Sequence, residues 1–358
     1  MKNKPETLVI FSPAFPKDED DTEWLPWLQA IVKALNKNFP SLNIIVFAFQ
    51  YPHHTKTYQW DSNAIIAFSG MHRGRFSHLF MWLNIIRKFN AIKSDHNVKG
   101  IFSLWCGECT LLAKYCSRFF SVPYYCWVLG QDARPFNKYV KWIKPKPQQL
   151  IAMSDFLVQQ FYKSHGIKPS GIIMNGVEPS MFVPLPSKRN IDIIAVGGLS
   201  VLKRYDIFIE VIASLRETFP AINATLCGDG EETGYLKKMI SELALEKNVE
   251  LAGSVKHSTA IQKMQQAKIL LHPSSYEGFS SVCLEALYAG AHVISFIKPM
   301  HYNIKNWHIV NTKEEMIWKA IELLQDKQLQ HESVLVQSMD GIAKEITALF
   351  GITENNRK

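Results

Sequence analysis

The chain has 358 residues, 47% of them hydrophobic and 20% charged, a balance that excludes a disordered or fibrous protein and predicts two globular domains. No apolar run approaches the ~20 residues of a membrane-spanning helix, and the first apolar run is too short for a secretory signal, so we expect a cytoplasmic protein. The net charge of +8 favours anionic partners, whether nucleic acid, anionic lipid head groups or phosphorylated substrates, and does not choose between them.

In the first half of the chain, apolar runs of strand length alternate with segments of helical periodicity. Residues 24–35 carry apolar side chains at three- and four-residue steps, which predicts a helix. Strand, helix and strand in alternation predict a parallel sheet covered by helices on both faces. The predicted strands are 8–11, 44–49, 64–68, 100–104, 123–129, 150–153 and 172–174, and the other predicted helices are 76–89, 110–120 and 154–165.

Residues 179–190 combine three prolines with little periodicity, and we interpret them as an interdomain linker. The predicted division is an N-terminal Rossmann-like domain over residues 1–185 and a C-terminal one over residues 186–340. Residues 341–358 would form a terminal helix and tail that pack back on the N-terminal domain.

The second half has a cleaner alternation of strands and helices, typical of a second Rossmann-like domain. Ligands of such open sheets bind beyond the carboxyl ends of the strands, so the residues after each strand are the candidate site. Glycines follow three of these strands, where they let the backbone come close to a ligand. The predicted strands are 191–196, 224–227, 249–252, 269–272 and 292–296, and the predicted helices are 205–218, 235–245, 259–266, 281–289, 315–324 and 342–350.

Charged and polar side chains follow the same strand ends. Lys203 places a mobile positive charge near the start of one helix. The helix that begins at Ser280 and Ser281 offers free N–H groups and the positive end of its dipole, which suit a diphosphate. Glu277 precedes that helix and Glu285 lies inside it. A carboxylate on a buried helix face requires hydrogen-bond donors, and the two hydroxyls of a ribose are suitable ones.

Residues 194–294 resemble the donor domain of the family 4 glycosyltransferases, which have the GT-B fold. The first half matches that family only in architecture and in Gly130-Gln131-Asp132. Asn175-Gly176-Val177 is similar to the family's interdomain segment. The motifs that carry the resemblance are Ala195-Val196-Gly197-Gly198-Leu199-Ser200 with Lys203, Cys227-Gly228-Asp229-Gly230, and Pro273-Ser274 with Glu277-Gly278-Phe279 and Leu284-Glu285-Ala286.

The resemblance implies a retaining, metal-independent hexosyltransferase with two doubly wound domains that face each other across a cleft. Its donor would be a UDP- or GDP-sugar, it would need no cofactor, and its acceptor would be a lipid-linked or cell-surface glycan intermediate. Lys203 would neutralise the diphosphate, Glu285 would bind the ribose, and Glu277 and Asp132 would be catalytic. The implied donor-binding residues are Gly197, Gly198, Lys203, Arg204, Gly228, Asp229, Gly230, Val255, Gly278, Phe279, Ser280, Ser281 and Glu285.

Two departures from the family leave other functions open. Position 198 is glycine where the family usually has an arginine on the diphosphate, a role that Arg204 would take over. Residues 296–306 replace the family's Gly-Gly loop. These departures support a non-catalytic nucleotide-sugar-binding protein as one alternative, and a nucleotide-sugar epimerase of the same fold is the other.

Other motifs are weaker. Residues 18–20, Asp-Glu-Asp, fit a metal-binding Asp-x-Asp, but we expect a solvated acidic loop. Cys106 and Cys109 form a single C-x-x-C, which we interpret as structural since a zinc site needs four ligands. His272 lies in an apolar strand and is predicted to be a core histidine. The lysines of 138–146, mixed with aromatic residues, indicate either a solvated face or contact with an anionic membrane surface. No nucleic-acid recognition motif is present, so we expect no such partner.

Overall fold

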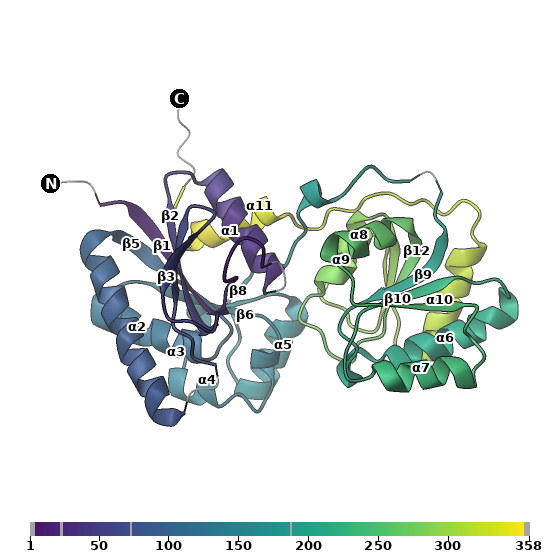
Figure 1. Cartoon of the computed structure of the whole chain (residues 1–358), viewed down its shortest axis with the longest axis horizontal. Helices are drawn as coiled ribbons and strands as arrows, with labels where there is room; N and C mark the ends of the chain where they lie inside the picture. The colour runs from purple at the N-terminus through teal and green to yellow at the C-terminus, as the bar shows by residue number, and fades with distance from the viewer. Residues whose placement is uncertain (1–3, 22–23, 72–73, 187, 354–358) are drawn as a thin grey trace. The chain divides into compact units, whose positions relative to one another are not determined.

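The computed structural model describes residues 4–21, 24–71, 74–186 and 188–353, and its contacts divide the chain into two units (Figure 1). The first unit comprises Met1–Asn175 and Met339–Lys358, and the second comprises Gly176–Ser338. Both units are α/β layers of the doubly wound kind, as the alternation of strands and helices predicts. Among the described residues, no helix combines the length and the apolar character that crossing a bilayer requires.

The first unit is built on one sheet in the order β3-β4-β2-β1-β5-β6-β7-β8. All its strand pairs are parallel except β3 with β4. The chain order reverses between β1 and β5, which makes their carboxyl ends the switch point of this sheet. The strands are β1 (Glu6–Ala14), β2 (Asn43–Tyr51), β3 (Thr57–Trp60), β4 (Asn63–Ala67), β5 (Asn97–Leu104), β6 (Tyr124–Val128), β7 (Leu150–Ala152) and β8 (Gly171–Ile172).

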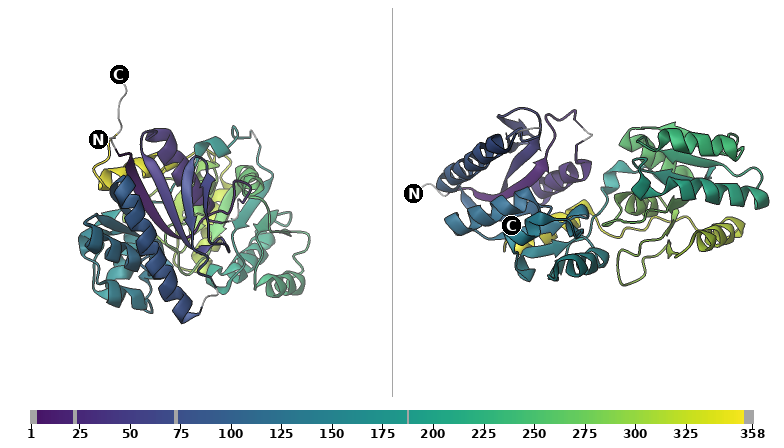
Figure 2. Two further views of the ribbon diagram at one scale, coloured as in Figure 1. Left: turned by 60° about the vertical axis from the view of Figure 1, so that its left-hand side comes forward. Right: turned by 90° about the horizontal axis from the view of Figure 1, so that it is seen from below.

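Helices cover this sheet and bury its apolar side chains. One core cluster joins the sheet to α2 and α3, and it is rich in stacked and edge-on phenylalanine rings such as Phe11, Phe47 and Phe89. Helix α11 packs beside α1, as Figure 2 shows, and Lys37 of α1 pairs with Asp340 of α11 at 2.6 Å. The helices are α1 (Pro26–Asn38), α2 (Arg75–Asp95), α3 (Glu108–Phe120), α4 (Lys138–Ile143), α5 (Asp155–His165) and α11 (Met339–Leu349).

The second unit has a parallel sheet in the order β11-β10-β9-β12-β13-β14. The switch point lies between β9 and β12, so the loops after these two strands are where a ligand of this fold is expected. Its strands are β9 (Ile191–Val196), β10 (Ala224–Cys227), β11 (Val249–Gly253), β12 (Ala267–His272), β13 (His292–Ser295) and β14 (Trp307–Ile309). Its helices are α6 (Tyr205–Thr218), α7 (Thr233–Glu242), α8 (His257–Gln266), α9 (Ser281–Tyr288) and α10 (Lys313–Gln325).

The interpretation of residues 179–190 as a linker is wrong, because this segment packs on the second unit. The buried Arg189 donates to the carbonyls of Ala267 at 2.5 Å and Ala289 at 2.7 Å, and the Phe182 ring meets the Tyr288 ring edge-on. The boundary therefore lies at 175–176, earlier than the predicted 185–186. Prolines rule out regular structure, but they do not prevent a segment from packing through its side chains.

Candidate functional site

The loops at the carboxyl ends of the second sheet are hydrogen-bonded to one another. Leu199 N donates to Asp229 O at 2.9 Å, Gly228 N to Gly253 O at 2.8 Å, and Ser275 N to Leu202 O at 3.0 Å. Backbone groups that follow β9, β10, β11 and β12 thus pair across the sheet edge. These loops, which we call the rim, therefore hold one another in place.

Three glycines are required for this packing. Gly197 and Gly228 have φ of +150° and +148°, and a Cβ on Gly228 would lie 1.9 Å from Gly197 O. A Cβ on Gly230 would lie 2.4 Å from Leu199 O. Gly198 is different, since a Cβ there would meet nothing within 4 Å. The first three glycines let the loops approach each other, whereas position 198 has room for a side chain.

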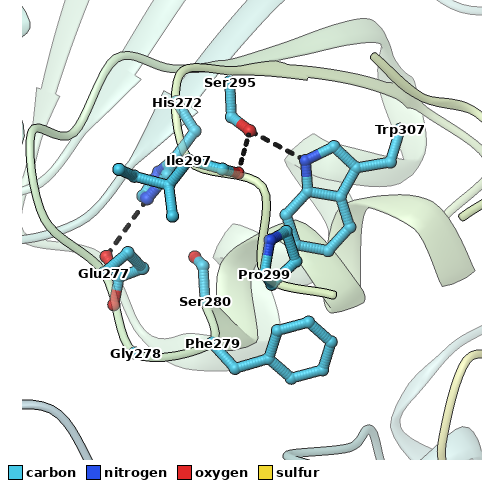
Figure 3. Close-up of a pocket in the computed structure, with 9 residues that line it drawn as sticks. All are labelled: His272, Glu277, Gly278, Phe279, Ser280, Ser295, Ile297, Pro299 and Trp307. Carbon is cyan, nitrogen blue, oxygen red and sulfur yellow. Dashed lines mark hydrogen bonds and ion pairs between the residues drawn. The ribbon is translucent and has the colours of Figure 1, made fainter. Parts of the chain in front are cut away.

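Lys203 and Glu277 meet at the switch point. The Lys203 Nζ lies 2.6 Å from Glu277 Oε2, and the same oxygen accepts a hydrogen bond from His272 Nε2 at 3.1 Å. Figure 3 shows the His272 imidazole and the Glu277 carboxylate pointing toward each other beside a small cavity. Glu277 Oε1 has no hydrogen-bond partner among the residues that the structure describes. One oxygen of this carboxylate is therefore fixed and the other remains able to accept.

The electrostatics of this cluster keep Glu277 ionised. Burial alone would raise the pKa of Glu277, but the hydrogen bond from His272 and the charge of Lys203 lower it to about 2. Burial lowers the pKa of His272, and the adjacent Lys203 lowers it further, so the imidazole is neutral near pH 7. A neutral His272 then donates its Nε2 proton to Glu277.

Glu285 has a histidine partner of its own. It lies on α9 with a mostly buried side chain, and its Oε1 is 2.8 Å from Nε2 of His257, the first residue of α8. This hydrogen bond raises the pKa of His257. Glu285 is thus held by α8, whereas Glu277 is held by Lys203 and His272.

Tyr205 supplies a buried hydroxyl without a partner at the same rim. Its Oη accepts and donates no hydrogen bond within the described ranges, and a Cβ on Gly197 would lie 2.7 Å from it. Tyr205 is the first residue of α6, directly after Lys203 and Arg204. A buried polar atom without a partner is costly, so this hydroxyl is a candidate for a contact with water or ligand.

Helix α9 begins at Ser281, where the sequence predicts a helix start, and its N-terminus remains the predicted position of an anion. Ser280 is the N-cap and its Oγ accepts from Cys283 N at 3.4 Å, while Ser281 and Val282 begin the helix. The Phe279 ring is buried and stacks on Trp307 with centroids 5.8 Å apart. The structure therefore places the Phe279 side chain in the core, so only the backbone of Gly278 and Phe279 faces the rim.

The remaining predicted donor residues have partners within the protein. The Arg204 guanidinium binds both carboxylate oxygens of Asp206, at 3.0 Å to the nearer one. Asp229 is exposed and accepts from Thr233 Oγ1 at 2.7 Å and Gly230 N at 2.8 Å. Val255 is half-buried in the loop between β11 and α8.

Asp132 lies in the first unit, after β6. Its buried carboxylate accepts from Cys106 N at 2.8 Å, Gly130 N at 2.8 Å and Leu129 N at 3.1 Å. Burial raises the pKa of Asp132 and these backbone donors oppose the rise. A carboxylate with three backbone donors organises its own loop, so its predicted catalytic role rests on the resemblance alone.

A carboxylate that the sequence analysis missed lies at the switch point of the first unit. Glu108 begins α3, and its mostly buried side chain accepts from Trp82 Nε1 at 2.6 Å, from His78 Nδ1 at 3.1 Å and from Gln50 Nε2. Its position directly after a buried strand was the available signal. The sequence predicts that His272 lies in the core, and its burial confirms this, but its hydrogen bond to Glu277 and the contact of His257 with Glu285 are not predicted.

The acidic loop and the cysteines, which the sequence indicates to be structural, have partners or positions that can be stated. Asp18 Oδ1 accepts from Asp21 N at 2.9 Å, and Glu19 Oε1 accepts from Asp61 N at 3.2 Å, so these acids hold their own loop. All six cysteines are buried free thiols. Within the described ranges, no three His, Cys, Asp or Glu side chains are arranged to hold a metal ion.

Residues 178–334 match the family described as Glycosyl transferases group 1. A curated relative, the gpi3 subunit of phosphatidylinositol N-acetylglucosaminyltransferase from Schizosaccharomyces pombe, is 30% identical over 164 residues, which are 44% of this chain and 36% of that protein. The match thus spans about a third of this relative's length.

Two solved structures share the fold of the whole chain. Anabaena HepE in complex with UDP and glucose has a TM-score of 0.64 at 15% identity, and the match covers 98% of each chain. Sucrose-phosphate synthase from Thermosynechococcus elongatus has a TM-score of 0.65 at 15% identity over 96% of this chain and 95% of that one. The chain therefore has the GT-B fold, with two Rossmann-like units, and carries a glycosyl transferases group 1 domain over residues 178–334.

Proposed function

We propose that this protein transfers a sugar from a nucleotide-sugar donor, of the UDP type, to an acceptor. The observation that carries the proposal is the Glu277 carboxylate at the switch point of the second sheet, with one oxygen held by Lys203 and His272 and the other able to accept. An ionised, oriented carboxylate suits contact with the hydroxyls of the transferred sugar. The presence of UDP in the HepE complex supports the choice of base over GDP.

The surrounding groups suit the rest of such a donor. The N-terminus of α9 at Ser280 and Ser281 would bind the diphosphate together with Lys203, because N–H groups and a cation stabilise the charge of the leaving nucleotide. Glu285, oriented by His257, would accept from the ribose hydroxyls. The backbone from Gly253 to Val255 would contact the base. We propose retention of configuration and no metal requirement, since Lys203 and helix N–H groups supply the positive charge.

The acceptor would bind to the first unit. Glu108, at the switch point of the first unit, orients His78 through a hydrogen bond with Nδ1. The half-buried imidazole then has Nε2 available for a hydroxyl group of the acceptor substrate. We propose a lipid-linked or glycan acceptor, which the name of the gpi3 relative supports because its own substrate is phosphatidylinositol. Asp132 would keep the loop after β6 in place for this binding.

The test combines donor binding with product analysis. The unmodified chain is titrated calorimetrically with UDP, GDP and their sugars, and transfer of radiolabelled sugar to a lipid extract is then measured, with and without a chelator. We expect UDP-sugar binding, transfer that survives the chelator, and loss of transfer in Glu277→Ala, with circular dichroism showing that this variant is still folded. Full activity in that variant would remove the role of Glu277.

Product analysis also separates the alternatives. Conversion of the nucleotide sugar without any acceptor would identify an epimerase. Tight binding with neither transfer nor hydrolysis would identify a binding protein, an interpretation that the glycine at position 198 favours.

A further inference from the structure

Positive charge is concentrated in one part of the first unit. Residues 74–149 contain twelve Lys and Arg and three Asp and Glu, a net charge of +9, whereas the whole chain has +8. The remainder of the chain is therefore close to neutral. Two of the three acids, Glu108 and Asp132, are engaged inside the fold and contribute little to the surface.

This part of the chain forms α2, α3 and α4, which adjoin one another in Figure 1. Lys114 of α3 donates to Ile143 O at 2.7 Å and thereby ties α3 to the end of α4. Large apolar side chains point into solvent from all three helices or from the turn before α4. They are Leu79, Phe80 and Leu83 of α2, Tyr115 and Phe119 of α3, Phe136, and Trp142 of α4.

The exposure of these side chains is unusual for a core-forming helix. Phe80 is 70% exposed, Leu83 57% and Phe119 63%, while the opposite face of α2 is buried through Met81, Ile85 and Phe89. Helix α2 is therefore apolar on both faces near its N-terminus. Large exposed apolar side chains that are concentrated on adjacent helices, rather than scattered singly, indicate a contact site.

Exposed basic side chains alternate with the apolar ones. Arg87 and Lys88 follow Leu83 on α2, Arg118 precedes Phe119, and Lys138 lies 5.6 Å above the Trp142 ring. Lys141 and Lys144 complete the α4 segment and are exposed as well. Aromatic and leucine side chains that enter a head-group layer, surrounded by cations that stay at its surface, match an anionic bilayer.

We propose that the surface formed by α2, α3 and α4 docks this protein on an anionic lipid membrane. Charge complementarity selects the occupant, since a basic rim around exposed apolar groups fits anionic head groups above acyl chains. Leucines on α2 favour a bilayer over single-stranded nucleic acid, which requires aromatic stacking rather than aliphatic contact. The surface lies apart from the donor residues of the second unit in the chain, so this inference does not depend on the proposed transfer reaction.

The test is co-sedimentation of the full chain with vesicles. Phosphatidylcholine vesicles are compared with vesicles of phosphatidylcholine and phosphatidylglycerol at low and high salt. We expect binding to the mixed vesicles that falls as salt rises. In Lys138→Gln/Lys141→Gln/Lys144→Gln the partition coefficient should fall on the order of a hundredfold, at about fivefold per lysine. Phe80→Ser should lower it by about tenfold.

A matched control removes the same charge elsewhere. Lys238→Gln/Lys247→Gln/Lys327→Gln changes three exposed lysines of the second unit and should bind mixed vesicles like the unmodified chain. Equal binding to neutral vesicles, or equal losses in the two triple variants, would overturn the proposal. So would binding of single-stranded RNA without binding of vesicles. UDP titration of every variant reports on the donor site separately.

Discussion

Lys203 and Arg204 are adjacent in the chain, but their side chains pair with different carboxylates. This difference predicts different effects on donor binding. Lys203 contacts only Glu277 in the described structure, whereas Asp206 holds Arg204 through both carboxylate oxygens. Lys203→Ala should weaken UDP binding by about 10- to 100-fold, the worth of ~1.5–3 kcal/mol for a charge-assisted hydrogen bond. Arg204→Ala should weaken it by less than about threefold, because the pair with Asp206 already satisfies the guanidinium.

Isothermal titration with UDP measures both affinities, and circular dichroism checks that each variant is folded. Equal losses in the two variants would mean that Arg204 leaves Asp206 and takes the place of the arginine that position 198 lacks. Arg204 is placed for such a move, because it lies at the start of α6 next to Lys203 in the chain.

At this scale the sequence predicts which carboxylates matter but not their partners. The sequence identifies Glu277 and Glu285 because they follow Gly-rich strand ends closely, and this is a local property of the chain. His272 and His257 reach them from β12 and α8, over separations that depend on how the strands and helices pack. An apolar strand containing His272 looks like core, and the residue is indeed buried, but it also donates to a functional carboxylate. Burial and function are not exclusive, and periodicity detects only burial.

The loops after β9 and β10 are held together by close backbone contact, which predicts a sharp difference between two glycines. Gly228→Ala introduces a Cβ at a φ of +148° and 1.9 Å from Gly197 O, so it should cost about 2–4 kcal/mol of unfolding free energy. Gly198→Ala has open space and should stay within about 0.5 kcal/mol of the unmodified chain. Urea denaturation of both variants measures these changes. A similar loss in both would contradict the loop geometry described here.

The sequence predicts most strands and helices of both units, because long apolar runs and helical stripes are local signals. It misses β3, α4 and β14 for different reasons. β3 and β14 are short edge strands with mixed composition, and α4 is a six-residue helix whose lysines and aromatics hide any periodicity. β14 forms because Val293 and Trp307 pair at the sheet edge and the Trp307 indole donates to Ser295 Oγ at 2.8 Å. Such elements are fixed by tertiary contacts.

The chain as a whole divides where its packing divides, and composition alone misplaces that boundary. Arg189 satisfies carbonyls at the ends of α8 and α9, which draws the proline-rich segment onto the second unit. The return of residues 339–353 to the first unit follows from the apolar face of α11, where Ile342, Ala343 and Ile346 are buried. The sequence predicts a terminal helix packed on the first domain from the same amphipathic pattern, and the contacts of α11 with α1 agree with it.

Three histidines of the second unit make stability of the whole chain sensitive to mild acid. His292 Nδ1 lies 3.2 Å from His308 Nε2, and His331 Nδ1 lies 3.0 Å from Gly290 O, so the cluster joins the last two strands to the segment that leads to α11. Burial, followed by the charge of His292, lowers the pKa of His308 to about 4. Burial, followed by the Arg189 charge, lowers the pKa of His331 to about 4, and burial lowers that of His292.

These directions determine the sign of the pH dependence. An unfolded histidine binds its proton near pH 6.5, whereas the folded cluster resists protonation until about pH 4. Below pH 6.5 the unfolded state therefore binds more protons, so the unfolding free energy falls as the pH falls from about 6.5 to about 4 and then levels off for this cluster. Allowing for solvent screening, the cluster should cost about 2–4 kcal/mol over that window.

Urea denaturation at several pH values measures this slope. The double variant His308→Gln/His331→Gln keeps neutral hydrogen-bonding side chains and should reduce the slope between pH 6.5 and 4. His292 and His272, whose pKa values are also lowered by burial, account for the slope that remains. Glu277, with a folded pKa of about 2, starts to lose its contribution only near its ordinary value of 4.5, so it affects only the lowest part of the window. An unmodified chain with constant stability from pH 7 to 4 would show that the cluster accepts protons without cost, against the burial that the structure gives it.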